Sequence, residues 1–206
     1  MVNILIRTSN RPEYFKDCIK SIKRQTYKDV NIIVGNDQDD EYCKDYNPIK
    51  LTRTNSTAHR IDTAAHFPCN DYLNTMLKEV KRGRVMFLDD DDELVGNDSL
   101  KLIMDNSYDK GGVTFWRVLY GKRVVPSGPN WMKRPVLRDI SGIGFCFHSK
   151  YIPLIHIAPY KQMDYRLADQ LYSWCRHTWL DHILTQAKTE GGGQRKDKNI
   201  SISTSL

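Results

Sequence analysis

Five consecutive acidic residues follow directly on an apolar stretch at residues 85–88. They are Asp89, Asp90, Asp91, Asp92 and Glu93. An unbroken apolar stretch is typical of a strand buried on both faces of a parallel sheet, and ligands of open α/β sheets bind beyond the carboxyl ends of such strands. Mg²⁺ and Mn²⁺ prefer carboxylate oxygens and keep positions for water and substrate phosphates. The run therefore indicates a divalent-cation site, with a solvated acidic turn as the alternative.

The elements that would position this run form a mostly parallel α/β sheet in the first hundred residues. Pro12 favours a helix start, and Gly83 a helix end. The apolar spacing predicts strands at residues 2–7, 30–34, 50–54 and 85–88, and helices at residues 12–22 and 70–81. Strand and helix alternate, as they do in parallel sheets.

The second half mixes a hairpin with helices. The pattern predicts a helix at residues 100–104, a hairpin at 113–120 and 123–125, a strand at 143–147 and an amphipathic helix at 167–188. Trp174 and Trp179 would face the core from that last helix. A glycine-rich, basic stretch follows at residues 191–196.

The composition limits which classes of binding partner the protein could have. The chain has 206 residues, with 31 basic against 25 acidic ones and a net charge of +6, which favours an anionic partner. Its five scattered cysteines include no Cys-x-x-Cys pair, so we expect reduced thiols and a cytoplasmic protein. No apolar stretch approaches the ~18 residues of a membrane span, so we expect no transmembrane segment and no export.

Three segments in order resemble the opening of a family 2 glycosyltransferase with the GT-A fold. They are the turn from Ile6 to Pro12, the Gln25-Thr26-Tyr27 step with the strand ending at Asn36-Asp37, and the run from Asp89 to Asp92, which resembles the DXD motif of that family. The resemblance covers residues 3–93 well and the remainder loosely. The chain also resembles a glycosyltransferase domain of a multidomain chlorella-virus protein, which implies a viral protein in the host cytoplasm.

The resemblance implies roles for single residues. Those that match positions contacting the nucleotide-sugar are Thr8, Arg11, Asn36, Asp37, Asn74, Asp89 and Asp90. Either Asn36 or Asp37 would contact the base. Asp91 matches the metal ligand and Asp89 a carboxylate that reaches the ribose or the metal, while a register one residue later would use Asp90 and Asp92. His148, after a predicted strand, is a candidate to complete the metal shell.

Transfer of a sugar also needs a base for the acceptor hydroxyl. Asp169 matches the base position at the start of a late helix, with Ala168 in place of the usual first acid, and Asp164 is the alternative. Either aspartate could instead be a helix N-cap. The missing first acid leaves a retaining mechanism open. Trp131, in a loop rich in proline and glycine, is the preferred candidate to stack on an acceptor sugar.

These features predict one GT-A-like α/β domain over residues 1–190, with a nucleotide-binding half at 1–93 and an acceptor half at 94–190. Residues 191–206 would be a basic tail or a lid over the diphosphate. We expect a hexosyltransferase that moves a sugar from a UDP-sugar to a glycan or other hydroxyl acceptor with Mn²⁺ or Mg²⁺. The chain is short for this class, so it is expected to belong to a longer polypeptide.

Two other functions compete. A metal-dependent nucleotidyltransferase or phosphohydrolase would also need carboxylates and Mg²⁺, although no P-loop is present. A nucleic-acid-binding module would account for the net charge, but the basic residues are dispersed and no RRM, KH or zinc-finger pattern occurs. We therefore expect no nucleic acid partner.

Overall fold

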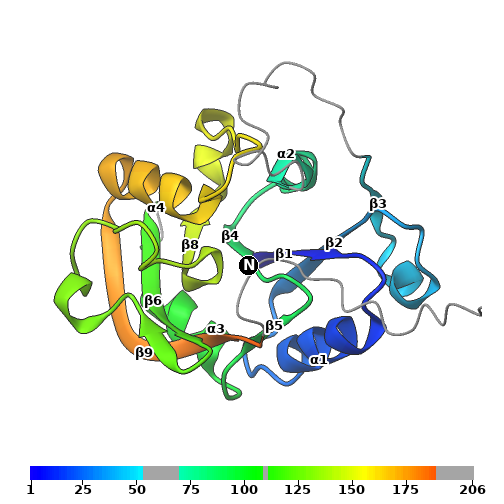
Figure 1. Cartoon of the computed structure of the whole chain (residues 1–206), viewed down its shortest axis with the longest axis horizontal. Coiled ribbons are helices and arrows are strands. Elements are labelled where there is room, and N and C mark those ends of the chain that lie inside the picture. Colours follow the sequence, from blue (N-terminus) through cyan, green and yellow to red (C-terminus); the bar gives the residue numbers. More distant parts are fainter. Residues whose placement is uncertain (53–69, 109–110, 189–206) are drawn as a thin grey trace, which may run out of the picture.

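The computed structural model describes residues 1–52, 70–108 and 111–188, and its described strands form one nine-stranded sheet (Figure 1). The strands are β1 (Val2–Thr8), β2 (Val30–Asn36), β3 (Ile49–Lys50), β4 (Arg84–Phe87), β5 (Asp92–Leu94), β6 (Val113–Tyr120), β7 (Arg123–Val125), β8 (Phe145–His148) and β9 (His177–Ala187). The α-helices are α1 (Pro12–Lys23), α2 (Asp71–Leu77), α3 (Ser99–Asp105) and α4 (Met163–Trp174). Short 3₁₀ helices are Glu41–Tyr46, Gly128–Asn130, Gly142–Gly144 and Ser149–Leu154.

The strand order is β3-β2-β1-β4-β8-β6-β9-β5, with β7 paired to β6. The first four strands of this order are parallel, so β1, β2 and β4 end at one edge of the sheet, here called the carboxyl edge. Strand β8 is antiparallel to both β4 and β6, and therefore β6 also runs toward the carboxyl edge. Only four residues join β4 to β5, although three strands lie between them in the sheet. The sheet must therefore curl, as Figure 1 shows.

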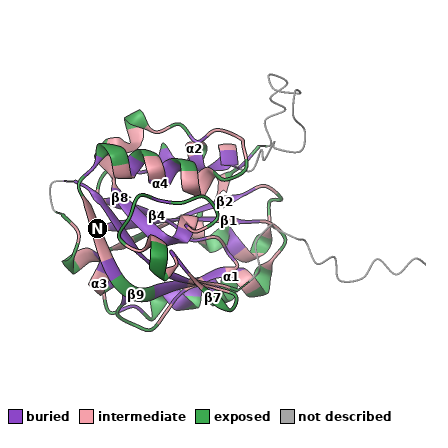
Figure 2. Cartoon of the chain, turned by 60° about the vertical axis from the view of Figure 1, so that its left-hand side comes forward, coloured by how far each residue is buried: buried purple, intermediate pink, exposed green. Residues whose placement is uncertain are grey.

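Two layers of apolar side chains fill the two faces of the sheet. Helices α1 and α3 bury Phe15, Ile22 and Ile103 against one face. Helices α2 and α4 bury Met76 and Leu171 against the other. In Figure 2 the central strands are buried and the helices are exposed only on their outer sides. The structure thus has the mixed α/β architecture with a curled, mostly parallel sheet that the sequence predicted.

Several predicted boundaries shift. Helix α2 ends at Leu77 instead of residue 81, and Gly83 precedes β4 with a positive φ of 93°. Strand β3 has two residues, and residues 53 and 54 of the predicted strand lie outside the described residues. The four described cysteines are buried free thiols. Among the described residues, no helix is long and apolar enough to cross a membrane.

The predicted helix over residues 167–188 is wrong in its second half. Helix α4 stops at Trp174, Cys175 is extended, and β9 follows as a parallel neighbour of β6 and an antiparallel neighbour of β5. Leu180 and Leu184 are both buried, and residues four apart share a face in a helix and in a strand alike. Local spacing therefore could not distinguish the two, and pairing with β6 and β5 decides.

The sequence predicts that Trp174 and Trp179 face the core from the last helix. Trp174 is 48% exposed at the end of α4 and does not face the core. Trp179 does pack against the core, but from β9, where its ring stacks on Phe115 with 4.6 Å between centroids. The prediction is therefore wrong for Trp174, and for Trp179 it is wrong only in the element.

Candidate functional site

The acidic residues follow β4 at the carboxyl edge, as the sequence predicted. Backbone N–H groups of Leu88 and Asp90 donate to the carbonyls of Leu5 and Arg7, so the ladder with β1 continues past the end of β4. The N–H of Lys188, just after β9, donates to the carbonyl of Asp91 at 3.1 Å. We call Asp89, Asp90, Asp91 and Asp92 the acidic loop. Strands β1 and β9 hold its backbone from two sides.

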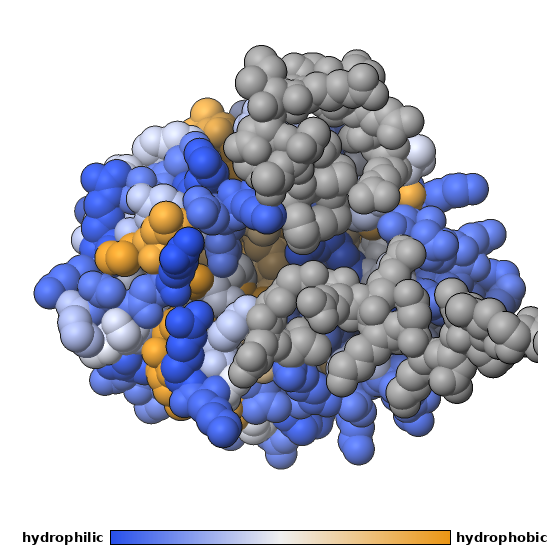
Figure 3. Space-filling model, in the orientation of Figure 1, coloured by the Kyte–Doolittle hydropathy of each residue, from blue (hydrophilic) through white to orange (hydrophobic). Residues whose placement is uncertain are grey.

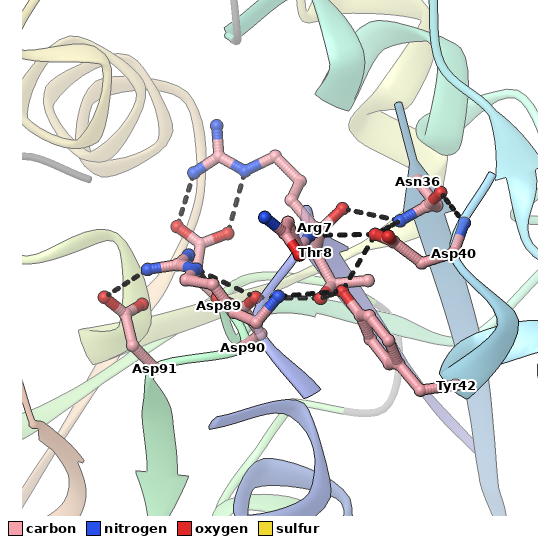
Figure 4. A network of polar contacts seen from close by, with 10 residues as sticks. Arg7, Thr8, Asn36, Asp40, Tyr42, Asp89, Asp90 and Asp91 are labelled. Atoms are coloured by element: carbon pink, nitrogen blue, oxygen red, sulfur yellow. Dashed lines mark hydrogen bonds and ion pairs between the residues drawn. The ribbon is translucent and has the colours of Figure 1, made fainter. Parts of the chain in front are cut away.

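Two arginines pair with three of the four carboxyl groups of the acidic loop (Figure 4). Arg7, on β1, donates from Nε to Asp89 at 2.8 Å and from Nη2 to the other oxygen at 2.5 Å. Arg11, just before α1, contacts both Asp90 and Asp91. Such charge-assisted, two-point contacts fix carboxylates in orientation as well as in charge.

The four carboxyl groups have different surroundings. The Asp90 side chain is fully buried and accepts from the Thr8 hydroxyl at 2.8 Å. Burial raises the pKa of Asp90 to about 7, although Arg11 opposes that rise. Asp92 is also buried, and burial raises its pKa well above the ordinary value, with the charges of Asp89 and Asp91 adding to the rise. Asp89 and Asp91 keep 30% and 12% exposure, so they are the two that face solvent.

A second polar network joins the ends of β1 and β2 beside the acidic loop (Figure 4). The Asn36 amide donates to the Thr8 carbonyl at 3.0 Å and to Asp40 at 2.8 Å, and its oxygen accepts the N–H groups of Gln38 and Asp40. The Tyr42 hydroxyl lies 2.7 Å from that of Thr8 and donates to Asp40. Every polar atom of Asn36 is therefore used to shape the loop after β2.

Asp37 has a different setting from its neighbour. One carboxylate oxygen accepts from the Tyr72 hydroxyl at 3.1 Å. The other oxygen is buried and has no hydrogen-bond partner among the residues that the structure describes. A buried acceptor without a donor is costly unless a ligand supplies one. Of the two residues expected to contact the base, Asp37 is therefore the one that still has an oxygen able to accept a hydrogen bond from a ligand.

The structure does not bring two predicted residues to the acidic loop. The Asn74 amide donates to the carbonyl of Ile157 at 2.7 Å and accepts its N–H at 2.9 Å, which clamps α2 to that segment. His148 pairs in register with Arg84 at the start of β4, about 10 Å of strand from its carboxyl end. Its Nδ1 accepts the N–H of Lys150. The expectation that His148 completes a metal shell at the acidic loop is wrong, because β8 runs antiparallel to β4 and carries it to the opposite edge.

The two candidate bases both lie on α4, and neither is its N-cap, which is Gln162. Asp164 is in the first turn and half-buried, and this burial raises its pKa although the Tyr165 N–H donates to it at 2.8 Å. Asp169 accepts two hydrogen bonds from Arg134, at 2.5 and 2.9 Å, and Arg134 lowers its pKa. Asp169 is thus paired at the surface, whereas Asp164 has no cationic partner among the described residues.

Tyr120 and Asp164 both lie near the carboxyl edge. Tyr120 ends β6 there and pairs with Ala187, which on its other side pairs with Asp92. A Cβ atom placed on Gly142 would lie 3.6 Å from the Cβ of Asp164, and Gly142–Gly144 leads into β8, which begins at the carboxyl edge because it is antiparallel to β4. Burial raises the pKa of Tyr120, Arg123 opposes the rise, and the charges of Asp92, Asp164 and Asp91 add to it.

Trp131 is held rather than free. The Arg117 guanidinium lies 4.2 Å over its ring, and its ring meets that of Trp179 edge-on at 5.1 Å. Arg117 also donates to the Pro126 carbonyl at 2.9 Å. One face of the predicted stacking residue is therefore already covered, and Trp131 anchors the loop after β7.

Three residues of the site went unassigned in the sequence analysis. Arg7 lies in the turn from Ile6 to Pro12, but nothing in the local sequence shows which acid it would pair with. Asp40 is the residue just before the 3₁₀ helix Glu41–Tyr46, and Tyr42 is its second residue. No periodic pattern in the sequence marks either of them. An aspartate followed by a tyrosine two positions on is too common to signal a network, so only the fold could reveal it.

The donor set can be tested against a divalent cation. Among the described residues, no group of three or more His, Cys, Asp or Glu side chains could enclose a metal ion. Mg²⁺-type ions, however, are commonly held by one or two carboxylates together with substrate phosphates. Asp89 and Asp91 provide hard oxygens with partial exposure at the carboxyl edge. The residues therefore fit a cation shared with a diphosphate and do not form an all-protein cage.

Comparison with known proteins assigns the family. Residues 3–162 match the family described as Glycosyl transferase family 2, and the chain belongs to that family. It is a glycosyltransferase domain with the GT-A fold. A curated relative is the teichoic acid poly(glycerol phosphate) polymerase of Staphylococcus epidermidis, 33% identical over 105 residues, which are 45% of this chain and 13% of that protein.

Solved structures agree on the fold. S. aureus TarS matches with a TM-score of 0.66 and 17% identity over 91% of this chain and 36% of its own. TarS 1–349 in complex with UDP-GlcNAc gives a TM-score of 0.64 and 16% identity over 93% of this chain and 59% of its own. The mannosyltransferase PcManGT from Pyrobaculum calidifontis, in complex with GDP-Man and Mn²⁺, gives a TM-score of 0.60 and 15% identity over 91% of this chain and 56% of its own. The chain thus spans less than two thirds of the proteins it matches.

Proposed function

We propose that this domain transfers a sugar from a nucleotide-sugar, a UDP-sugar first of all, to a hydroxyl group of a glycan or similar acceptor. The observation that carries the proposal is the convergence at the carboxyl edge of Thr8, Asp37 and the acidic loop, with the start of α4 and Asp164 near the same edge. Two structural neighbours are in complex with nucleotide-sugars, UDP-GlcNAc and GDP-Man, which supports this class of donor.

The nucleotide base is proposed to bind at Asp37. Its buried oxygen needs a donor, and uracil and guanine both present a ring N–H where cytosine and adenine present an acceptor nitrogen. Asn36 is proposed to fix the shape of the loop that carries Asp37, through three hydrogen bonds to that loop and one to Thr8. UDP is therefore the first nucleotide to test and GDP the second.

The diphosphate is proposed to lie over Asp89 and Asp91, with Mn²⁺ or Mg²⁺ held between these carboxylates and the phosphates. Such an ion, when bound, acts as a Lewis acid that stabilises the charge on the leaving nucleoside diphosphate. Arg7 and Arg11 keep the carboxylates oriented, and the buried Asp90 links them to Thr8. The alternative register through Asp90 and Asp92 has less support, since both of those side chains are buried.

Asp164 is proposed as the base that takes the proton of the acceptor hydroxyl. It lies in the first turn of α4, lacks a cationic partner among the described residues, and has a pKa raised by burial, which makes it a stronger base than an ordinary carboxylate. Asp169 is already paired with Arg134. A single base opposite the leaving group corresponds to an inverting transfer.

Some expectations from the sequence stay predictions. The division into two halves, the role of residues 191–206, which lie outside the described residues, and the cytoplasmic site of action are among them. The viral origin stays one too, because the relatives named above come from staphylococci and Pyrobaculum calidifontis. Attachment to a longer polypeptide is proposed from the greater length of those relatives.

Calorimetric titration of UDP, with and without Mn²⁺, tests the proposal on the wild type, Asp37→Asn and Asp91→Ala. We expect Mn²⁺-dependent UDP binding that Asp91→Ala abolishes and Asp37→Asn weakens about tenfold, the effect of losing one charge-assisted hydrogen bond. Bound UDP would then justify a screen of UDP-sugars by product detection. If neither UDP nor GDP binds with or without Mn²⁺, the proposed donor site is wrong.

A further inference from the structure

Arg11 uses three nitrogen atoms on two neighbouring carboxylates. Its Nε donates to Asp90 at 3.1 Å, its Nη2 contacts the other oxygen of Asp90, and its Nη1 donates to Asp91 at 3.1 Å. One planar guanidinium therefore bridges a fully buried acid and a partly exposed one. The bond to Asp91 uses a nitrogen that the contacts with Asp90 do not need.

The two contacts differ in what their loss would cost. Asp90 has a side chain with no exposure, and a buried carboxyl group that loses a hydrogen-bond donor is costly in either protonation state. Asp91 is 12% exposed and lies at the carboxyl edge, where water or a cation can replace the arginine. The contact with Asp90 is therefore the permanent one, and the contact with Asp91 is the one that can exchange.

We propose that Arg11 is a positioning residue that holds Asp91 in the free protein and yields it to the divalent cation, while it remains bound to Asp90. This inference rests on the proposed function, since it concerns the same cation. It predicts a competition between a side chain of the protein and the metal for one carboxylate. Weak binding of Mn²⁺ without nucleotide follows, because the ion must first displace Nη1 from Asp91.

Arg134 provides a matched comparison outside the acidic loop. It places Nε and Nη2 on the two oxygens of Asp169, which takes no part in the proposed cation site. Replacing either arginine by lysine keeps the positive charge but puts a single ammonium in place of the planar guanidinium and its separate nitrogens. Of these two replacements, the one at position 11 is the one that takes a nitrogen away from Asp91.

The experiment titrates Mn²⁺ alone into the nucleotide-free protein and follows free Mn²⁺ by electron paramagnetic resonance at constant ionic strength. We expect Arg11→Lys to bind Mn²⁺ about tenfold more tightly than wild type, the effect of one charge-assisted hydrogen bond no longer opposing the ion. Arg134→Lys is expected to stay within about twofold of wild type. Adding Asp91→Asn to Arg11→Lys should remove the gain.

A second variant guards against loss of the fold. Arg11→Gln would leave Asp90 buried without a cationic partner, with the Thr8 hydroxyl still donating to it. The pair Arg11→Gln/Asp90→Asn removes both ionisable groups, and a cooperative thermal transition checks that it folds. This double variant should also bind Mn²⁺ more tightly than Asp90→Asn alone.

The outcomes separate the inference from the proposed function. If wild type binds Mn²⁺ and Arg11→Lys binds it no more tightly, or Arg134→Lys gains equally, the competition at Asp91 is refuted while the donor site stands. If no variant binds Mn²⁺, with or without UDP, the inference falls together with the metal-dependent mechanism.

Discussion

Asp164 and Asp169 lie on the same helix, five positions apart, and have opposite surroundings. Five positions separate them by about 7.5 Å along the axis and about 140° around it, so they cannot both face one substrate. Both are half-buried, but Arg134 holds Asp169 and lowers its pKa, whereas Asp164 has no cationic partner among the described residues and has a raised pKa. The two side chains are both carboxylates, so their positions on α4 determine that Asp164 is available as a base while Asp169 is held in an ion pair.

The first prediction compares Asp164→Asn with Asp169→Asn. We expect Asp164→Asn to lower kcat about 10²- to 10⁴-fold, the usual contribution of a general base, with little change in UDP affinity. Asp169→Asn should cost only about 1 kcal/mol of stability or less, because its partner Arg134 is 66% exposed. Steady-state kinetics and UDP titration on both variants measure this. A larger kcat loss in Asp169→Asn would reverse the assignment.

The second prediction concerns the pH dependence of kcat. The base must be deprotonated to accept a proton, so activity should fall as the pH drops through the pKa of Asp164. Burial raises that pKa, so the acid limb should lie above the ordinary aspartate value of about 3.9. The same loss of activity at low pH should be seen in Asp169→Asn, which keeps Asp164 as its base. If the residual activity of Asp164→Asn falls over the same pH range as wild type, the titrating group is a different residue.

The third prediction concerns stability and Asp90. Its folded pKa of about 7 exceeds the unfolded value of about 3.9, so the native state holds a proton that the unfolded chain releases. The contribution of Asp90 to stability is therefore full below about pH 4 and is lost as pH rises toward 7, by up to about 1.4 kcal/mol per pH unit. Above pH 7 it should be constant.

The comparison with Asp90→Asn isolates this group. Thermal or urea unfolding of wild type and Asp90→Asn between pH 4.5 and 8.5 gives the difference in unfolding free energy at each pH. As the pH rises to about 7, we expect the unfolding free energy of wild type to fall relative to that of the variant. Above pH 7 the difference between the two should stay constant. A difference that does not depend on pH would mean that Asp90 stays ionised across the range, held so by Arg11.

The first half of the fold could be predicted because its signals are local. The apolar stretches of β1 and β4 are buried on both faces, and α1 has its apolar residues at helical spacing after Pro12. Asn10 adopts a positive φ of 50° at the turn where the chain was expected to bend. Here residue preference, periodicity and tertiary position all agree.

The rest could not be predicted because partners distant in the chain decide it. Strand β9 forms by pairing with β6 and β5, some sixty to ninety residues away, and no local pattern contains that information. Arg7 meets Asp89 because β1 and β4 are neighbours, and His148 is distant because β8 is antiparallel. The sequence could indicate which residue types serve a diphosphate site, but strand order determines which of them meet.

Exposed hydrophobic residues on the described surface do not gather into one patch that would indicate a binding site. The face shown in Figure 3 is mainly hydrophilic, and hydrophobic residues form small separate groups on it. Exposed apolar side chains among the described residues include Met132, Leu154 and Trp174, which lie on different elements. The charges of the carboxyl edge, rather than an apolar patch, therefore give the most specific experiments on this domain.

The last prediction compares three glycines. A side chain at Gly83 would be strained by a φ of 93° and would place its Cβ 2.6 Å from the Met1 carbonyl oxygen. Gly96 has a φ of 70° but open space around it, and Gly128 has neither constraint. Replacement by alanine should therefore cost about 3 kcal/mol at Gly83, about 1 at Gly96 and less than about 0.5 at Gly128. Urea unfolding of the three variants checks this order. Equal losses at Gly83 and Gly96 would mean that residue 1 moves aside, and that β4 does not depend on the close approach of Met1.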